Sequence, residues 1–248
     1  YVNSTPTIVL SGGIRQSSVG KGAIHDVDQL EILGTVTKWC GKAKSYEDIQ
    51  PLLHQAFLEA SSGRPRPTFI EIPLDVQSTT GVTKGIGTLE IFSSTRDLMK
   101  AGVVADILMK AERPVIIVGG GVLTSGANSE LLALADCLTI PVATTITAKE
   151  AIPDSSPLSL GLLNDDVARA IIPEADVILA LGCRFAERST SAWTLRMHGK
   201  LIHVDVDSSE IGRNYPVAIG VVCDAKLFLK GLLKLIEGKS RTKNEAFL

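Results

Sequence analysis

Three consecutive glycines, Gly119, Gly120 and Gly121, follow an apolar run at 115–118 and are the most informative feature of the sequence. The apolar run is typical of a buried parallel strand, and residues 127–138 have the pattern of a helix. Many α/β proteins bind a diphosphate at a glycine turn between a strand and a helix. The glycines let the backbone approach the diphosphate closely, and free N–H groups at the start of the helix face the anion. Thr124 stands where the fingerprint G-x-G-x-x-G has its third glycine, so a tight turn without a ligand is an equal alternative.

More side chains with binding chemistry follow the other expected strands. The carboxyl ends of parallel strands meet at one edge of a sheet, where ligands bind. An arginine there can grip a phosphate with two hydrogen bonds, and an aspartate can accept hydrogen bonds from ribose hydroxyls. Structural roles are the alternatives: Arg184 could form a surface ion pair, and Asp205 or Asp207 could cap a helix near Ser208. The residues expected at this edge are Thr145, Ile146, Gly182, Cys183, Arg184, Phe185, Asp205, Asp207 and Asp224.

Other kinds of site are disfavoured by what the sequence lacks. The end of the second strand holds Thr144 and Thr145 instead of the acid that would meet an NAD ribose, which argues against a simple dehydrogenase. The sequence contains neither G-x-S-x-G nor a His-x-x-x-His pair, and no metal-ligating set is predicted. His203 lies in an apolar strand and is interpreted as a core histidine. His25, beside Asp26 and Asp28, is a candidate proton carrier, with an exposed loop as the alternative.

Composition narrows the class of protein. The 248 residues carry a formal net charge of −2, and no basic stripe is present, which argues against a nucleic-acid partner. The four cysteines are far apart and form no C-x-x-C, so we expect free thiols in a reducing compartment. No apolar run reaches membrane-spanning length, and no signal-peptide pattern occurs, so no membrane partner is expected. These features predict a cytoplasmic α/β protein.

The first part of the chain, residues 1–77, is predicted to be an incomplete α/β domain. A sheet of at most three strands with one helix cannot bury both of its faces. We therefore interpret it as the C-terminal part of a larger domain, whose remaining strands would lie before Tyr1. Strands are expected at 7–10, 36–38 and 68–72, and a helix with Ser45 as its N-cap at 46–61.

Residues 95–238 are predicted to form a complete domain, because strand and helix patterns alternate regularly. The fold class is α/β: a Rossmann-like doubly wound parallel sheet, covered on both faces and preceded by the partial α/β domain. The polar segments 78–94 and 239–248 are expected to be linkers. Strands are expected at 115–118, 141–145, 176–182, 201–207 and 217–222, and helices at 95–111, 127–138, 165–172 and 225–236.

Five segments together resemble the thiamine-diphosphate-dependent enzymes of the acetolactate synthase type. They lie at 36–38, 64–77, 113–121, 182–185 and 203–212, and the resemblance covers essentially the whole chain. It implies the end of a pyrimidine-binding domain at 1–77 and a central domain at 95–238. The implied activity is decarboxylation of a 2-oxo acid and transfer of the acyl anion to a second 2-oxo acid, in branched-chain amino acid biosynthesis. The implied assembly is a homodimer or tetramer.

The resemblance also implies cofactors. It places the glutamate that activates thiamine diphosphate before Tyr1 and the Gly-Asp-Gly magnesium motif after Leu248, so the chain alone is expected to be inactive. The segment that contains His25 corresponds to an active-site segment with glutamine at that position. The central domain is expected to bind FAD, with ADP, coenzyme A or no ligand as alternatives; a stand-alone nucleotide-binding module without catalysis is the alternative function. The implied FAD contacts are Gly119, Gly120, Gly121, Thr145, Ile146, Gly161, Gly182, Arg184, Phe185, Asp205, Val206 and Asp224.

Overall fold

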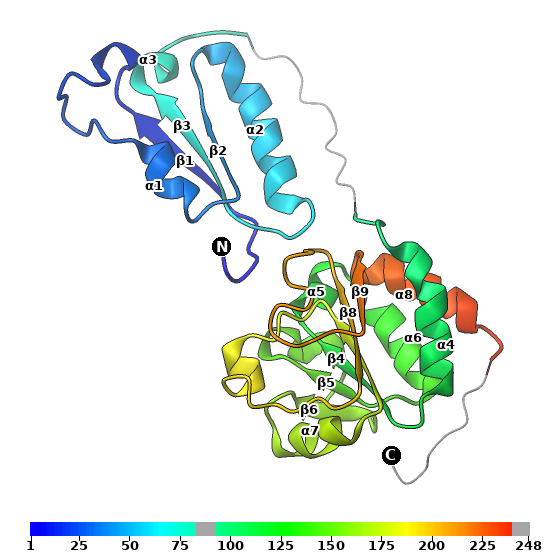
Figure 1. Ribbon diagram of the computed structural model, residues 1–248. Coiled ribbons are helices and arrows are strands. Elements are labelled where there is room, and N and C mark those ends of the chain that lie inside the picture. The colour runs from blue at the N-terminus through cyan, green and yellow to red at the C-terminus, as the bar shows by residue number, and fades with distance from the viewer. Residues whose placement is uncertain (83–92, 240–248) are drawn as a thin grey trace. The chain divides into compact units, whose positions relative to one another are not determined.

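Alternating strand and helix patterns build two separate parallel sheets, one in each of two units of the chain. The computed structural model describes residues 1–82 and 93–239, and the units are Tyr1–Phe92 and Ser93–Leu248. Each unit is an α/β arrangement in which helices pack on a parallel sheet (Figure 1). The expected linkers 78–94 and 239–248 lie mostly outside the described residues.

The sheet of the first unit has three parallel strands in the order β1-β3-β2. The central strand β3 is buried along most of its length, whereas β1 is an edge strand on which Val9 is 41% and Leu10 is 56% exposed. The sheet therefore leaves apolar surface uncovered, as expected for so few strands. The strands are β1 (Ile8–Gly13), β2 (Trp39–Lys42) and β3 (Thr68–Pro73), and the helices are α1 (Gln29–Gly34), α2 (Tyr46–Ser61), α3 (Leu74–Gln77) and the 3₁₀ turn η1 (Gln16–Ser18).

Local signals explain where α2 begins and ends. Its N-terminus carries a capping box, in which the Asp48 carboxylate accepts from the backbone N–H of Ser45 at 2.9 Å. At its other end, the Lys38 ammonium donates to the carbonyls of Glu59 and Ser62, both at 2.7 Å. A cation there satisfies carbonyls that the helix leaves unpaired and opposes the negative end of its dipole. The predicted helix at 46–61 is confirmed.

The prediction of a short strand at 36–38 is wrong. The strand lies at Trp39–Lys42, because residues 35–37 close the end of α1, a helix that the sequence analysis did not anticipate. The backbone N–H of Val36 and the hydroxyl of Thr37 both donate to the carbonyl of Leu33. Because of these bonds, Val36 and Thr37 lie in a turn and do not pair with a neighbouring strand.

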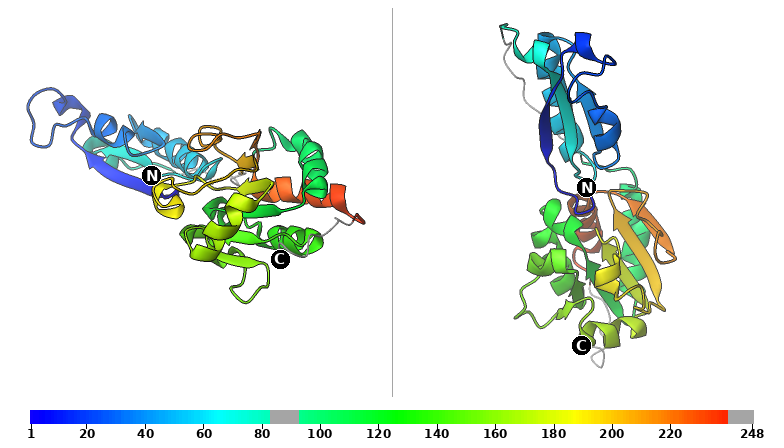
Figure 2. Two further views of the ribbon diagram at one scale, coloured as in Figure 1. Left: turned by 60° about the horizontal axis from the view of Figure 1, so that its bottom comes forward. Right: turned by 90° about the vertical axis from the view of Figure 1, so that its left-hand side faces the viewer.

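The second unit has a six-stranded parallel sheet in the order β6-β5-β4-β7-β8-β9. Two further views show helices lying against this sheet (Figure 2). Numbered within the unit, the strands follow the order 3-2-1-4-5-6 of dinucleotide-binding sheets, whose direction reverses between the first and fourth strands. The Rossmann-like fold class is thereby confirmed. The strands are β4 (Pro114–Val118), β5 (Val142–Thr144), β6 (Ser159–Leu162), β7 (Val177–Leu181), β8 (Lys200–Asp205) and β9 (Ile219–Val222).

Five strands were expected in this unit, and β6 is the sixth. It lies at the edge of the sheet, has the sequence Ser-Leu-Gly-Leu and is only partly buried. Neither β-branched residues nor a clean alternation marks it, so the usual strand signals are missing. It adds Gly161 to the edge at which the candidate residues gather.

Helices and turns cover the two faces of this sheet unequally. Alternate side chains of β4 show this, because Ile116 and Val118 pack into one core whereas Val115 and Ile117 pack into the other. The first face is covered by α4 (Ala101–Lys110), α6 (Asn128–Leu138) and α8 (Ala225–Ile236). The second is covered by α7 (Asp166–Ile171), the 3₁₀ turn η4 (Ile172–Glu174) and residues around 185–197. The remaining short elements are α5 (Gly120–Thr124) and the 3₁₀ turns η2 (Leu98–Lys100), η3 (Ile146–Ala151) and η5 (Glu187–Thr190).

Within the described ranges 1–82 and 93–239, no helix has the length and apolar composition that a membrane-spanning helix requires.

Candidate functional site

The edge of the second sheet brings most of the expected residues together. β4 and β7 are neighbours and end in register at Val118 and Leu181, so the glycine turn and the Gly182 turn face each other where the strand order reverses. In open α/β sheets, ligands bind in the crevice at this point. Thr145 and Ile146 follow β5, Gly161 lies in β6, and Asp205 ends β8.

The glycine turn is packed directly against the turn after β7. The N–H of Gly119 donates to the carbonyl of Leu181 at 2.9 Å, and that of Gly121 donates to the carbonyl of Gly182 at 3.1 Å. A Cβ on Gly121 would lie 2.7 Å from the Cα of Gly182, which is closer than carbon atoms approach. Close contact between two turns is therefore enough to require glycine at these positions, and two of the N–H groups have protein acceptors. A diphosphate at Gly119, Gly120 and Gly121 stays a prediction.

The segment after β7 holds Arg184 between two buried residues. Cys183 and Phe185 are buried, and Arg184 is half-buried. Burial raises the pKa of the Cys183 thiol to about 12, so it is not a nucleophile at neutral pH. The ring of Phe185 packs edge-on against the rings of His203 and Tyr215, with centroids 5.3 and 5.2 Å away. Arg184 is thus held at the sheet edge by two neighbours whose side chains are buried.

Three aspartates near this edge have local structural partners. Asp205 accepts from the N–H of Asp207 at 2.9 Å, and Asp207 accepts from the N–H of Ser209 at 3.0 Å. The helix expected near Ser208 is absent, so these carboxylates stabilise a turn and not a helix start. Asp224 is the N-cap of α8 and accepts from the N–H of Leu227 at 3.0 Å. Contact of Asp205, half-buried Val206 and Asp224 with a ligand stays a prediction.

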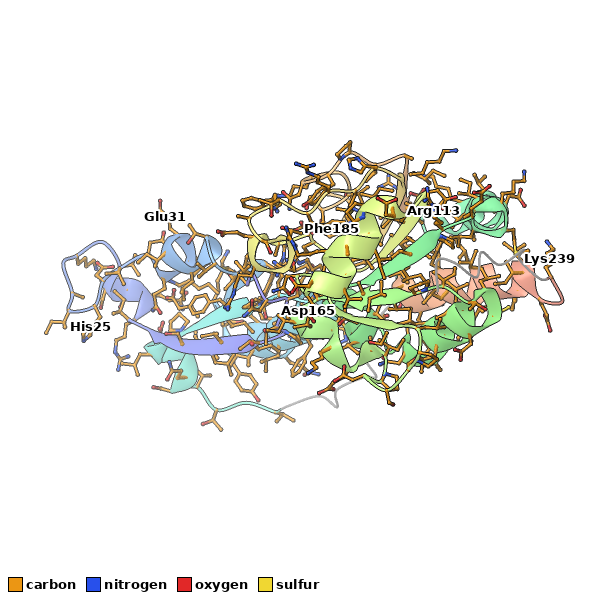
Figure 3. The ribbon with its side chains drawn as sticks, turned by 90° about the horizontal axis from the view of Figure 1, so that it is seen from below. His25, Glu31, Arg113, Asp165, Phe185 and Lys239 are labelled. Atoms are coloured by element: carbon orange, nitrogen blue, oxygen red, sulfur yellow. The ribbon has the colours of Figure 1, made fainter. Side chains whose placement is uncertain are left out.

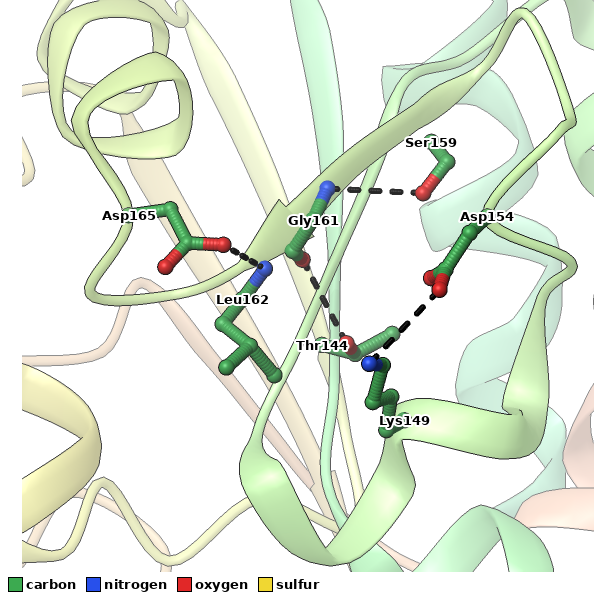
Figure 4. A pocket seen from close by; sticks show the side chains of 7 residues that line it. All are labelled: Thr144, Lys149, Asp154, Ser159, Gly161, Leu162 and Asp165. Carbon is green, nitrogen blue, oxygen red and sulfur yellow. Dashed lines mark hydrogen bonds and ion pairs between the residues drawn. The ribbon is translucent and has the colours of Figure 1, made fainter.

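A pocket opens between the ends of β5 and β6 (Figure 4). Its volume is about 280 Å³, which would hold part of a nucleotide. Gly161 has φ 74°, a left-handed conformation that favours glycine, and the Asp165 carboxylate accepts from the N–H of Leu162 at 2.8 Å. Lys149 forms an ion pair with Asp154 at 3.6 Å. The lining is predominantly polar and consists of Thr144, Lys149, Asp154, Ser159, Gly161, Leu162 and Asp165.

Sequence reasoning found only part of this pocket. Gly161 was expected, whereas the other six lining residues were not assigned to a site. The missed strand β6 explains the omission, since without it the loop residues could not be placed beside β5. Thr145 is buried, and Ile146 is 69% exposed at the start of η3, an apolar side chain presented to solvent beside the glycine turn.

His203 is confirmed as a core histidine. It is 1% exposed, and its Nε2–H donates to the carbonyl of Cys183 over 2.9 Å. Burial lowers its pKa to about 4, so the imidazole is neutral at physiological pH. The bond to a carbonyl requires the proton on Nε2.

His25 lies on the exposed loop between β1 and α1 of the first unit (Figure 3). Its φ of 67° is left-handed, an uncommon conformation for a residue other than glycine. The acidic neighbours act locally, since Asp26 accepts from the N–H of Gly20 at 2.8 Å and Asp28 caps α1 through the N–H of Glu31 at 3.0 Å. Both acids thus bind backbone N–H groups, and a catalytic role for His25 stays a prediction.

The first unit also contains a buried charge that the sequence analysis missed. Glu71 lies in the central strand β3, is 3% exposed and forms an ion pair with Lys42 of β2 at 2.7 Å. An acid within the apolar run Thr-Phe-Ile-Glu-Ile was the available signal, because a buried carboxylate needs a partner. The pair lies where the register joins the carboxyl halves of β2 and β3.

No group of three or more His, Cys, Asp or Glu side chains in the described part of the chain could hold a metal ion. Thiamine diphosphate is bound in proteins together with a divalent cation, so the described residues do not fit that pair, and we assign neither to them.

Comparisons with known proteins agree with this geometry. The family model "Thiamine pyrophosphate enzyme, central domain" matches residues 102–232, more than half of the chain. A crystal structure of benzoylformate decarboxylase from Polynucleobacter necessarius superposes with a TM-score of 0.84 at 23% identity, covering 98% of this chain and 46% of that one. At that identity the likeness shows the fold alone.

Curated relatives match both units. The chain is 35% identical over 252 residues to the probable acetolactate synthase large subunit of Methanocaldococcus jannaschii, covering 94% of this chain and 41% of that protein. It is 32% identical over 256 residues to the acetolactate synthase large subunit of Buchnera aphidicola, covering 98% and 44%. The chain thus spans less than half the length of these relatives. The resemblance drawn from its motifs is confirmed: the chain belongs to the thiamine pyrophosphate enzyme family, and residues 102–232 are its central domain.

Proposed function

We propose that this sequence is part of an acetolactate-synthase-like enzyme. Such an enzyme decarboxylates a 2-oxo acid with thiamine diphosphate and joins the acyl anion to a second 2-oxo acid, in branched-chain amino acid biosynthesis. The observation that carries the proposal is the extent of the match: acetolactate synthases align with 94–98% of the chain, through both units. A stand-alone nucleotide-binding module would have no use for the first unit, and no relative reported above supports it.

Thiamine diphosphate and magnesium enter this proposal through the family alone. When bound, thiamine diphosphate would supply the nucleophilic carbon of the reaction. We place His25 in the loop that meets the substrate, where its imidazole would act as a proton carrier. The exposure of His25 and its left-handed backbone favour this role, since strained residues cluster at functional sites. We derive no step through the cofactor from the described residues.

We further propose that the edge of the second sheet binds an adenosine diphosphate moiety, as part of FAD or as ADP. Four observations support it: the strand order of dinucleotide-binding sheets, the half-buried Arg184, the polar pocket between β5 and β6, and the exposed Ile146 after β5. Arg184 would bind the diphosphate with charge-assisted hydrogen bonds, and Ile146 would cover an apolar ring face. Because Gly119 and Gly121 already donate to backbone carbonyls, Arg184 carries more of the binding than the glycine turn does.

The resemblance also leads us to propose a homodimer or tetramer that acts in the cytoplasm. Light scattering on the purified full-length protein would give the mass of the assembly. A monomer at micromolar concentration would contradict the proposed oligomer without affecting the proposed reaction.

The reaction is tested with the full-length protein. We expect it to release CO₂ from pyruvate and to form acetolactate only when thiamine diphosphate and Mg²⁺ are both present. A second set of assays, with other 2-oxo acids as donor or acceptor, would define the specificity to which His25 contributes. Release of CO₂ with an aldehyde as the sole product would reassign the protein to simple decarboxylases, and no thiamine-dependent turnover of any 2-oxo acid would refute the proposal.

A further inference from the structure

Three consecutive backbone carbonyl groups after β7 each accept a hydrogen bond from a side chain. The carbonyl of Cys183 accepts from His203 Nε2 at 2.9 Å. The carbonyls of Arg184 and Phe185 both accept from Asn214 Nδ2, at 3.0 and 3.1 Å, and the carbonyl of Phe185 also accepts from Trp193 Nε1 at 3.0 Å. The donors come from β8, from the loop between β8 and β9, and from the turn after η5. Parts of the chain that are distant in sequence thus fix one short segment.

The segment needs such support because its backbone is strained. Phe185 has φ 51°, and Ser191, Ala192 and Trp193 follow with φ 49°, 54° and 59°. A non-glycine residue in a rare region of φ/ψ space is strained and persists only where the surroundings hold it. The side-chain hydrogen bonds are therefore a condition for the shape of the 182–193 loop.

Of the three donors, Asn214 is the one that acts on Arg184 itself. His203 is buried and Trp193 is half exposed with its indole N–H bonded inside the loop, so changing either alters packing as well as the hydrogen bond. Asn214 is exposed, and its amide donates to the carbonyls of Arg184 and Phe185. Its amide thus controls the orientation of two successive peptide groups at little cost to the core.

We propose that Asn214 is a positioning residue for Arg184: its amide holds the two peptide groups that set the place of the arginine at the sheet edge. The effect on the loop follows from the geometry alone. The effect on ligand binding rests on the proposed adenosine diphosphate site, and the two are measured separately.

The loop is tested first, without ligand, in Asn214→Ala and Asn214→Asp. Aspartate keeps the shape of asparagine but removes the donor and places a carboxylate against two carbonyl oxygens. Hydrogen exchange should become faster in 184–193 and stay unchanged in β4 and β8. In a Trp39→Phe background Trp193 is the single tryptophan, and its fluorescence should shift. Asn128→Asp is the matched control, because the Asn128 amide also donates to a backbone carbonyl, that of Glu150, away from the loop. Unchanged exchange and fluorescence in both Asn214 variants would overturn the proposal.

The consequence for binding is tested by a double-mutant cycle with Arg184→Ala. In the wild-type background, we expect Asn214→Ala to weaken ADP or FAD binding about 3- to 10-fold, the value of one hydrogen bond. In the Arg184→Ala background, its effect should fall below about 2-fold, because residues that act through one another are not additive. An equal loss in both backgrounds would show that Asn214 does not act through Arg184. If the wild-type protein binds neither nucleotide, the proposed nucleotide site fails, and the exchange data still decide whether Asn214 holds the loop.

Discussion

Arg184 is the single side chain on which the proposed nucleotide site depends most. We predict that Arg184→Ala lowers the affinity for ADP or FAD by about 1.5–3 kcal/mol, the range for a hydrogen bond to a charged group. Isothermal titration with ADP, FAD and coenzyme A would measure the loss and show which ligand is preferred. Arg113→Ala is the matched control, since Arg113 lies just before β4 at the opposite edge of the same sheet and pairs with Glu174 at 3.6 Å. Equal affinities of wild-type protein and Arg184→Ala for the bound ligand would remove Arg184 from the site.

His203 makes stability depend on pH in a defined window. Its pKa in the folded protein is about 4, below the value of about 6.5 for an unfolded chain, because burial disfavours the imidazolium. Between pH 6.5 and 4 the unfolded chain binds a proton that the folded protein does not, so stability falls as the pH falls. The full loss is roughly 3 kcal/mol.

His203→Gln isolates this contribution, because glutamine can donate to the carbonyl of Cys183 and does not titrate. Urea unfolding at pH 7 and pH 4.5 should show a loss on acidification that is about 2–3 kcal/mol larger in the wild-type protein than in the variant. Carboxylates contribute equally to both proteins and cancel in the difference. The same loss in both would mean that His203 is not buried and neutral.

At the residue scale, the sequence could predict types of residue but not their partners. The core role of His203 followed from its place in an apolar strand. Other partners depend on loop geometry, which the periodicity of a sequence does not encode. Examples are the cap of α8 by Asp224, the hydrogen bond from the N–H of Asp207 to Asp205, and the hydrogen bond from Asn214 to the carbonyl of Arg184. The residues expected at the sheet edge are brought there by strand order, whereas their contact with a ligand is a matter for the titrations above.

At the scale of elements, the two turns that follow β4 and β7 behave as one packed unit. We predict that Gly121→Ala destabilises the protein by about 1–3 kcal/mol, because its Cβ would lie 2.7 Å from the Cα of Gly182. The midpoint of urea unfolding measures this. Gly102→Ala is the control within α4, where nothing lies within 4 Å of the added methyl group and alanine should stabilise the helix by about 0.5–1 kcal/mol. If the two variants are equally stable, the turns are not in contact.

The long elements were predictable because their patterns are strong. The apolar stripe of α2, the buried strands β4, β7 and β8, and the helix α8 all lie where periodicity and caps place them. The failures are short elements whose sequences lack those signals. α1 has six residues, α5 has five residues within the glycine turn, and β6 has four residues with a glycine at its third position. Because β6 was missed, the pocket was missed too, and six of its seven lining residues were left out of the candidate site.

At the scale of the whole molecule, the two units should differ in stability. The second unit has six strands and two apolar cores, whereas the first has three strands and an edge strand with exposed Val9 and Leu10. We predict slow hydrogen exchange in β4, β7 and β8 and much faster exchange in β1 and β3 of the 248-residue chain, because protection reports the free energy of local opening. Equally strong protection in both sheets at low protein concentration would show that the first unit is stable by itself.

The central proposal is that this chain is part of a thiamine-dependent carboligase and is inactive by itself. The most direct test compares acetolactate formation from pyruvate by the full-length protein and by the 248-residue chain, each with saturating thiamine diphosphate and Mg²⁺. The account predicts thiamine-dependent acetolactate from the full-length protein and none from the chain alone. Turnover by the purified 248-residue chain, or a folded full-length protein that consumes no 2-oxo acid, would contradict it.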